Sequence, residues 1–390
     1  MINFRYFIPT KILFGTNSLE RFHKENLPGK KALIVLSTGK SAIESGALGR
    51  LKKQLELNGT EYALYQGITA NPTRQEVMNG LEIYRKNSCD FIIALGGGSC
   101  IDAAKALAIV ATNGGDLWDY FHGGSAKGKQ VKIQMAPVIA IPTTAGTGSE
   151  VDQWMVISDK DKNEKIGFGY SKSFPTTAIV DPSIMITLPA MLTAYQGIDA
   201  LFHATEGYLS SEANPISDAL AEKAIALING SLANVVNNGE DIIKREEMAA
   251  ASTLSGMVLA LTSMTGEHAL GEGLSGFYSD LPHGVGLILI SLEYYTLIYN
   301  LGHSEERLIK MATLMGVENP KTGLDFVERL RLLYEECGIS EIKMSDYGIE
   351  KENFEKIVDI AMAHAASEFR AEKTPLTKEQ CVNLLNKSYR

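Results

Sequence analysis

The hydrophobic and polar positions follow two different patterns along the chain. Up to residue 180, short runs of consecutive apolar residues alternate with longer segments whose apolar positions recur every three or four residues. The short runs predict strands buried on both faces, and the longer segments predict amphipathic helices. The expected strands are KALIVLS (31–37), EYALYQG (61–67), FIIALG (91–96), APVIAIP (136–142) and TTAIVDP (176–182), and the expected helices include 41–59 and 71–87.

The second half of the chain has almost no strand pattern. Its helical patterns cover residues 216–236, 245–264, 304–316, 323–338 and 351–366. Buried strands that alternate with helices form a parallel sheet covered on both faces, whereas a run of helices forms its own layer. We therefore predict an α/β, Rossmann-like domain over residues 1–185, followed by an all-helical domain over 186–390.

Length, charge and cysteine content narrow the class of protein. A chain of 390 residues exceeds one compact core, which agrees with two domains. A net charge of -9 argues against nucleic acid as a partner. Four scattered cysteines without a C-x-x-C pair are typical of reduced thiols. No signal peptide or uninterrupted apolar membrane span is evident, so we expect a cytoplasmic protein that does not enter a membrane.

A glycine loop suggests a phosphate site. ALGGGSCIDAAKA (94–106) runs from a strand through three glycines and Ser99 into a helix. Glycines let backbone N–H groups approach an anion, which the positive end of the helix also attracts. The G-x-G-x-x-G spacing is absent after the first strand. A tight turn that needs glycine for its geometry alone is the alternative.

Two further loops extend this interpretation to a dinucleotide. IPTTAGTGSEV (141–151) places hydroxyls and glycines directly after a strand. The loop at residues 37–41 has no carboxylate to bind a ribose 2′-OH, but it contains Lys40. This composition modestly favours NADP(H) over NAD(H). A solvated loop lysine explains Lys40 equally well.

Four residues in the helical half are candidate metal ligands. In GIDALFHATEGY (197–208), Asp199 and His203 are four residues apart and share one helix face. His268 and His283 also lie among small or apolar residues. One carboxylate and three imidazoles suit Fe²⁺, Zn²⁺, Co²⁺ or Ni²⁺ better than Mg²⁺ or Ca²⁺. The alternative is that each histidine is a hydrogen-bonded core residue.

Three glutamates lie close to these candidates in sequence. Glu206 follows His203 on the same helix face and could orient a ligand. Glu267 and Glu272 flank His268 and could have the same function or be solvated.

The motifs together resemble one known family. GGGSCIDAAKA, IPTTAGTGSEV, GIDALFHATEGY and the segment from His268 to the PHG at 282–284 closely resemble the iron-containing (group III) alcohol dehydrogenases. The likeness extends to the opening YFIPTKILFG, which resembles the family's first hairpin, and to YQGITANPT. The resemblance implies a dehydroquinate synthase-like fold, Fe²⁺ or sometimes Zn²⁺, and a homodimer or larger homo-oligomer.

The resemblance also assigns functional residues. It implies metal ligands at Asp199, His203, His268 and His283, through which catalysis occurs. It further implies pyrophosphate contacts from Gly97, Gly98 and Ser99, and cofactor contacts from Thr143, Thr144 and Lys165. The complete set of predicted cofactor contacts is Ser37, Gly39, Lys40, Gly97, Gly98, Ser99, Asp102, Thr143, Thr144, Thr147, Ser149 and Lys165.

The function expected from these residues is metal-dependent hydride transfer between NAD(P) and a small alcohol or aldehyde. Many family members have a second histidine where this chain has Glu272, which affects substrate choice and proton handling. One alternative is a dehydroquinate synthase-like lyase that acts on a sugar phosphate. Another is a non-catalytic, ligand-binding relative. The apolar surroundings of the ligand helices argue against the lyase, and the presence of all four ligands argues against the second alternative.

Overall fold

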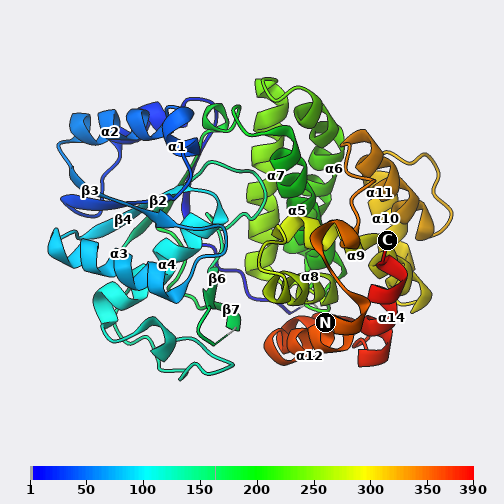
Figure 1. Ribbon diagram of the computed structural model, residues 1–390. Coiled ribbons are helices and arrows are strands. Elements are labelled where there is room, and N and C mark those ends of the chain that lie inside the picture. Colours follow the sequence, from blue (N-terminus) through cyan, green and yellow to red (C-terminus); the bar gives the residue numbers. More distant parts are fainter. Residues whose placement is uncertain (1–2, 163) are drawn as a thin grey trace. The chain divides into compact units, whose positions relative to one another are not determined.

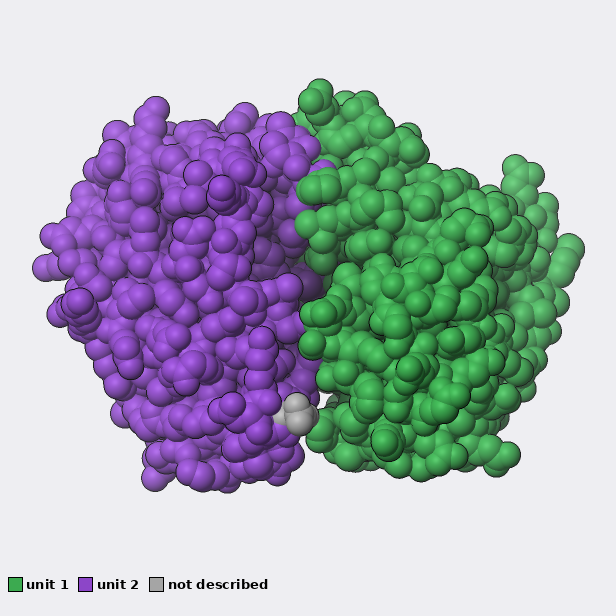
Figure 2. Space-filling view, in the orientation of Figure 1, with its two compact units in different colours: residues 1–6, 189–390 green, residues 7–188 purple. Residues whose placement is uncertain are grey.

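The computed structural model describes residues 3–162 and 164–390, and it divides into two compact units. One unit is Phe7–Leu188, and the other combines Pro189–Arg390 with the N-terminal segment that ends at Tyr6. Figure 2 distinguishes the two units by colour. The division falls after Leu188, whereas the sequence pattern placed it after residue 185.

The first unit is built on a six-stranded parallel sheet in the order β1-β8-β5-β4-β2-β3. The strands are β1 (Lys11–Phe14), β2 (Lys31–Ser37), β3 (Glu61–Ile68), β4 (Phe91–Gly96), β5 (Val138–Pro142) and β8 (Thr177–Val180). Every residue of β4 and β5 is buried, as expected for central strands covered on both faces. The predicted α/β fold class is therefore confirmed.

The opening segment departs from the hairpin suggested by family resemblance. Strand β1 pairs in parallel with β8, from Lys11 opposite Thr177 to Phe14 opposite Val180. A hairpin requires antiparallel neighbours, so that expectation is wrong for the described part of the chain. The segment instead extends the sheet at its edge.

Helices cover both faces of this sheet: α1 (Ser41–Glu44) and α2 (Ala47–Asn58) lie on one side, and α3 (Arg74–Lys86) and α4 (Gly98–Asn113) lie on the other (Figure 1). The single helix expected over 41–59 is broken in two, because Gly46 adopts a φ of 75°. Helix α3 begins with a capping box, in which Thr73 and Glu76 each accept a backbone N–H.

A two-stranded antiparallel sheet in the same unit was not predicted. Strands β6 (Trp154–Asp159) and β7 (Glu164–Gly169) pair along their whole length. In β6, buried residues alternate with more exposed ones, which is typical of a sheet with one covered face. The period-two pattern of WMVISD was thus a usable signal.

The second unit is helical, in agreement with the sequence pattern. Its helices are α5 (Ala190–Leu209), α6 (Pro215–Asn237), α7 (Ile242–Leu261), α8 (Gly266–Phe277), α9 (His283–Asn300), α10 (Glu305–Leu314), α11 (Leu324–Glu336), α12 (Phe354–His364), α13 (Ala366–Ala371) and α14 (Lys378–Ser388). Helices α5, α6 and α7 pack on one another, and α8 packs on α9 and α12. The predicted metal ligands belong to α5, α8 and α9.

Helix α6 is long and apolar enough to cross a membrane if judged by length and composition alone. Helices α7 and α8 satisfy the same test only as a pair, and that pair is bent by 103°. In the structure, α6 packs on α5 and α7, with Ala221, Ala224 and Ile225 fully buried. We therefore interpret α6 as a core helix of this unit.

Candidate metal centre and cofactor loops

Helix α5 buries a carboxylate and an imidazole on one face. The exposed fraction is 1% for Asp199 and 6% for His203. Every residue of α5 from Gly197 to Leu209 is buried, so neither polar group reaches bulk water through its own helix. Burial of this kind is costly unless a partner compensates the charge.

The imidazoles of three helices converge on one oxygen of Asp199. The Oδ1 atom lies 3.5 Å from Nε2 of His268, 3.5 Å from Nε2 of His283 and 3.8 Å from Nε2 of His203. The His203 and His268 rings stack with centroids 4.6 Å apart. The ligand atoms of Asp199, His268 and His283 all lie within 4.8 Å of one another. The structure therefore brings the four predicted ligands together.

These separations suit a coordinated cation better than direct hydrogen bonds. Ligand atoms about 2.1 Å from a tetrahedral ion stand about 3.4 Å apart. Within the described residues, both oxygens of Asp199 and the Nε2 atom of His268 are buried without a hydrogen-bond partner. Burial opposes ionisation of Asp199, but the imidazoles of His203, His283 and His268 lower its pKa. The donor set thus fits a divalent cation that prefers nitrogen and oxygen ligands.

Glu206 fixes the orientation of His268. Its carboxylate accepts a hydrogen bond from Nδ1 of His268, which leaves Nε2 as the atom nearest Asp199. It also accepts from the backbone N–H of Thr265 at 2.8 Å and the Thr265 hydroxyl at 2.7 Å. A carboxylate behind a metal-binding imidazole selects the tautomer and holds the ring in place. This contact agrees with the orienting function suggested by the sequence.

A second buried carboxylate supports the same helix end. Glu372 accepts a hydrogen bond from the backbone N–H of Gly266 at 2.9 Å and from the Tyr294 hydroxyl at 2.8 Å. Burial raises the pKa of Glu372 to about 7. Because Glu206 binds Thr265, two carboxylates satisfy N–H groups where α8 begins, two residues before His268. Sequence reasoning missed Glu372, which follows α13 and carries no local signal.

The two glutamates that flank His268 have different environments. Glu267 is fully buried, so the suggestion that it is solvated is wrong. Burial, followed by the charge of Glu206, raises its pKa well above the ordinary value. Glu272 is partly exposed. Burial and the nearby Glu272 carboxylate raise the pKa of Glu368 well above its ordinary value. Several acidic side chains therefore lie around α8.

The predicted cofactor loops of the first unit follow the carboxyl ends of neighbouring strands. Ser37 is the last residue of β2, and Gly39 and Lys40 follow it. The 96–99 loop begins at the last residue of β4, and the 143–149 loop follows β5. The chain places β3 on one side of β2 and β4 on the other, so the strand order reverses between β2 and β4. Open α/β sheets bind ligands at such a reversal, outside the carboxyl ends of the strands.

The start of α4 can receive an anion. Gly97 precedes the helix and, in the described part of the chain, no side chain caps it. The Ser99 hydroxyl donates to the carbonyl of Ala70 at 2.5 Å, which ties this loop to the segment after β3. The backbone N–H groups of the first turn, rather than that hydroxyl, are therefore the groups suited to phosphate.

The remaining predicted cofactor contacts differ in their exposure and in their hydrogen-bond partners. Ser149 is buried, and its hydroxyl donates to Asp102 at 2.6 Å, so both side chains make contacts inside the unit. Thr144 and Thr147 are partly exposed. The Thr143 backbone N–H donates to the carbonyl of Gly96 at 3.0 Å and joins the two loops. Lys165 lies in β7 opposite Ser158 and is partly exposed.

Comparison with protein families gives matches over both units. The family described as iron-containing alcohol dehydrogenase matches residues 9–182. The C-terminal domain of the Fe-containing alcohol dehydrogenase family matches residues 193–389. The two matches together cover nearly the whole chain.

Individual proteins are similar over comparable lengths. Alcohol dehydrogenase 4 of Saccharomyces cerevisiae (strain YJM789) is 36% identical over 388 residues, which cover 98% of each chain. The 1,3-propanediol dehydrogenase of Klebsiella pneumoniae is 36% identical over 370 residues, 92% of each chain. The crystal structure of an archaeal halo-thermophilic alcohol dehydrogenase from a Red Sea brine pool, bound to NZQ, superposes with a TM-score of 0.93 at 31% identity, covering 100% of this chain and 99% of that one.

Proposed function

The chain belongs to the iron-containing alcohol dehydrogenase family, and we propose that it interconverts a small alcohol and its aldehyde at a metal held by Asp199, His203, His268 and His283. It is an oxidoreductase of that family's nicotinamide-linked type. The observation that supports the metal site is the convergence of three imidazoles on the Asp199 carboxylate, whose two buried oxygens have no hydrogen-bond partner among the described residues.

The reaction exchanges alcohol and NAD(P)⁺ for aldehyde, NAD(P)H and a proton. When bound, a ferrous ion would supply Lewis acidity at the substrate oxygen, and the nicotinamide would carry the hydride. Asp199 contributes the one anionic ligand. Glu206 keeps the Nδ1 proton of His268 in place, so that Nε2 presents its lone pair in a fixed direction.

We further propose that Gly97, Gly98 and Ser99 receive the pyrophosphate through the backbone of the first turn of α4. Two observations support the assignment: no side chain of the described residues caps the start of this helix, and the helix begins at the reversal of strand order. NADP(H) is favoured over NAD(H) because the loop after β2 carries the exposed Lys40 and no carboxylate. Thr143, Thr144 and Lys165 complete the proposed contacts.

The lyase alternative requires basic groups for a phosphate and a carboxylate. The strongest charged influences on Glu206, Glu267, Glu368 and Glu372 are other carboxylates and His268, with no lysine or arginine among them. Carboxyl groups do not neutralise an anionic sugar phosphate, whereas a neutral alcohol needs no counter-charge. The electrostatics therefore favour the dehydrogenase.

The test is NADPH and NADH oxidation by chelator-treated protein that is reloaded anaerobically with Fe²⁺ or Zn²⁺, against a panel of small aldehydes. We expect metal-dependent turnover that is lost in His268→Ala and retained in His303→Ala, a control at an exposed histidine. If no aldehyde is reduced although metal and dinucleotide are both bound, the proposed reaction is overturned.

We also propose that the protein forms a homo-oligomer and is cytoplasmic. Strand β1 forms an edge of the sheet, and Phe7 and Phe14 are 41% and 44% exposed. Phe14 ends β1, whose outer edge pairs with no other strand among the described residues, and Phe7 lies just before this strand. These exposed aromatic residues support a homodimer or larger homo-oligomer. The four cysteines are free and buried, which agrees with a reducing, cytoplasmic environment. Light scattering after size-exclusion chromatography would test the first proposal, and fractionation of source cells would test the second.

A further inference from the structure

Helix α4 carries a lysine that is completely buried. Lys105 has an exposed fraction of 0%, and most of the residues of its helix are alanine or branched apolar residues. Its ammonium donates to the Ser149 hydroxyl, to Oδ1 of Asp152 and to the carbonyl of Trp154, each at 2.8 Å. All three N–H donors of the lysine are therefore used.

Ser149 connects this lysine to a second residue of α4. Its hydroxyl accepts from Lys105 and donates to Oδ1 of Asp102 at 2.6 Å. The other oxygen of Asp102 accepts the backbone N–H of Val156 at 3.0 Å. We call Asp102, Lys105, Ser149 and Asp152 the loop tie, because they join α4 to the loop after β5 and to the start of β6.

The two loops that the tie connects approach each other very closely. A Cβ atom on Gly98 would lie 2.6 Å from Cγ2 of Thr147, and one on Gly97 would lie 3.1 Å from Oγ1 of Thr144. A Cβ at Gly98 would fit only if Thr147 moved, and one at Gly97 would require a smaller adjustment of Thr144. The 96–99 and 143–149 loops therefore leave little space between them. A shift of α4 relative to the second loop would open or close this gap directly.

We propose that Lys105 is a positioning residue for the dinucleotide, which sets the separation of the 96–99 and 143–149 loops through Ser149 and Asp152. The inference rests on the proposed function, since these loops are its cofactor loops. We propose no direct contact between Lys105 and the cofactor. It acts by holding Ser149, on the second loop, against the helix that begins at the first.

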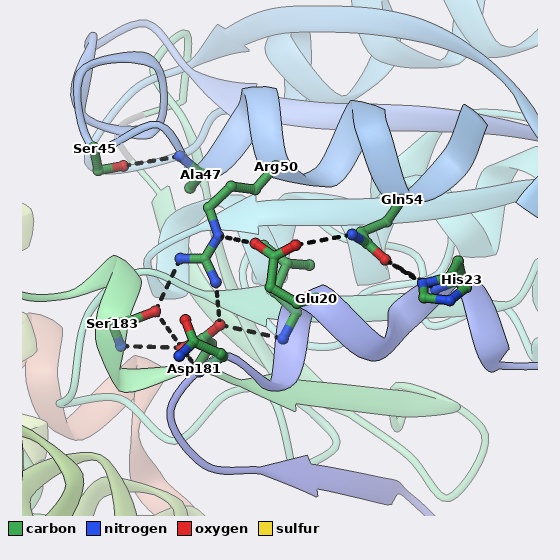
Figure 3. Close-up of polar contacts among 10 residues, drawn as sticks. Glu20, His23, Ser45, Ala47, Arg50, Gln54, Asp181 and Ser183 are labelled. Atoms are coloured by element: carbon green, nitrogen blue, oxygen red, sulfur yellow. Dashed lines mark hydrogen bonds and ion pairs between the residues drawn. The ribbon is translucent and has the colours of Figure 1, made fainter. Parts of the chain in front are cut away.

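A buried ion pair could instead serve stability alone, and the same unit offers a matched control. Arg50 of α2 donates to Asp181 at 2.8 Å, to Ser183 at 2.9 Å and to Glu20 at 2.6 Å (Figure 3). This cluster also joins a helix to the segment after a strand, but it includes none of the proposed cofactor contacts. Arg50→Met therefore removes a comparable basic residue without touching the loop tie.

The experiment compares wild type, Lys105→Met, Lys105→Met/Asp152→Asn and Arg50→Met as full-length protein. Calorimetric titration with NADPH and NADH gives Kd, thermal unfolding gives Tm, and steady-state assays give KM for the dinucleotide and kcat separately. The double variant removes both buried charges, so it should regain much of the Tm that the single variant loses, because an unpaired buried charge is more costly than none.

We expect the Kd and KM for the dinucleotide to rise about tenfold or more in both Lys105 variants, with a smaller change in kcat. Arg50→Met should lower Tm and leave Kd within about twofold of wild type. If the double variant regains affinity together with Tm, or if Arg50→Met weakens binding equally, the positioning function is overturned in favour of a structural one. A wild-type protein that binds neither dinucleotide would instead overturn the proposed function, and with it this inference.

Discussion

Each unit of the protein buries a cluster of charged side chains, and the polar groups of these two clusters are satisfied in opposite ways. In the loop tie, Lys105 has three acceptors, and Asp152 accepts from both Lys105 and the Trp154 backbone N–H. Around Asp199, three imidazoles approach within 3.5 to 3.8 Å, yet both carboxylate oxygens lack a hydrogen bond within the described residues. The polar groups of the first cluster satisfy one another, whereas the second cluster would be completed by the cation that we propose.

The comparison indicates how a buried polar cluster can be assigned a function. A satisfied cluster fixes the positions of the elements it joins, because every donor has its partner within the protein. A cluster with buried, unpartnered atoms has a free-energy cost that a ligand can remove. The metal-binding proposal and the positioning proposal follow from this one difference.

Removal of the carboxylate that the imidazoles surround should have the largest effect on metal binding and activity. Asp199→Asn keeps the shape of the side chain but removes the anionic ligand. We expect bound metal to fall to a small fraction of one equivalent and kcat/KM to fall by about 10³-fold or more. Metal analysis of the purified variant and the aldehyde reduction assay provide the two readouts. Full metal occupancy in Asp199→Asn would show that this residue is not a ligand.

Removal of the metal should affect one unit and spare the other. An ion that binds only the folded protein adds about 4 kcal/mol to the free energy of unfolding when its concentration is 1,000 times Kd. Chelation should therefore increase hydrogen exchange in α5, α8 and α9, and leave exchange in α4 unchanged. Hydrogen-exchange mass spectrometry with and without chelator measures this directly. Equal changes in both units would contradict a metal site confined to the helical unit.

The buried Glu372 side chain predicts that the free energy of unfolding depends on pH. Burial raises the pKa of Glu372 to about 7, above its ordinary value in the unfolded chain. Folding therefore favours the protonated form, and the contribution of Glu372 is fully present below about pH 4.5 and lost as the pH rises through 7. Above pH 7 this ionisation lowers the free energy of unfolding by up to about 3 kcal/mol, and Glu372→Gln should abolish that decrease.

Urea titrations at several pH values measure the effect of Glu372→Gln, and Glu61→Gln is a control because that side chain is 76% exposed. The pH dependence should flatten in the Glu372 variant only. An unchanged slope would mean that Glu372 stays ionised in the folded protein, despite its burial.

Much of this organisation is visible in the sequence, where the signal is local. Strands β4 and β5 are continuous apolar runs because both of their faces are covered, and Asp199 and His203 are separated by one helical turn. Each of these patterns extends over fewer than ten residues. Fold class and candidate ligands could therefore be predicted from the order of residues alone.

The partners of those residues could not be predicted in the same way. Glu372 meets Gly266 across 106 positions of sequence, and Lys105 meets Asp152 across 47. Nothing in the pattern around Glu372 distinguishes it from a surface glutamate. Lys105 did carry a signal, since it and Asp102 are charged residues in a largely apolar helix, but the acceptors that satisfy it lie on other elements. Such contacts are set by the tertiary structure rather than by local preference.

The smallest expected effect concerns the residue that orients a ligand without being one. Glu206→Gln retains a hydrogen-bonding side chain of the same size but removes the charge behind His268. Loss of such an orienting carboxylate lowers metal affinity by about 10- to 100-fold. Competition with a chromophoric chelator measures this affinity, and Glu293→Gln on α9 is a partly exposed control. Because Glu206 also accepts the Thr265 N–H, thermal unfolding of the metal-free variant separates loss of the helix cap from loss of metal. Weaker metal binding with an unchanged metal-free Tm would assign Glu206 to the metal site. A lower metal-free Tm with wild-type affinity would restrict Glu206 to capping α8, and would show that an unsatisfied cluster can bind its cation without such support.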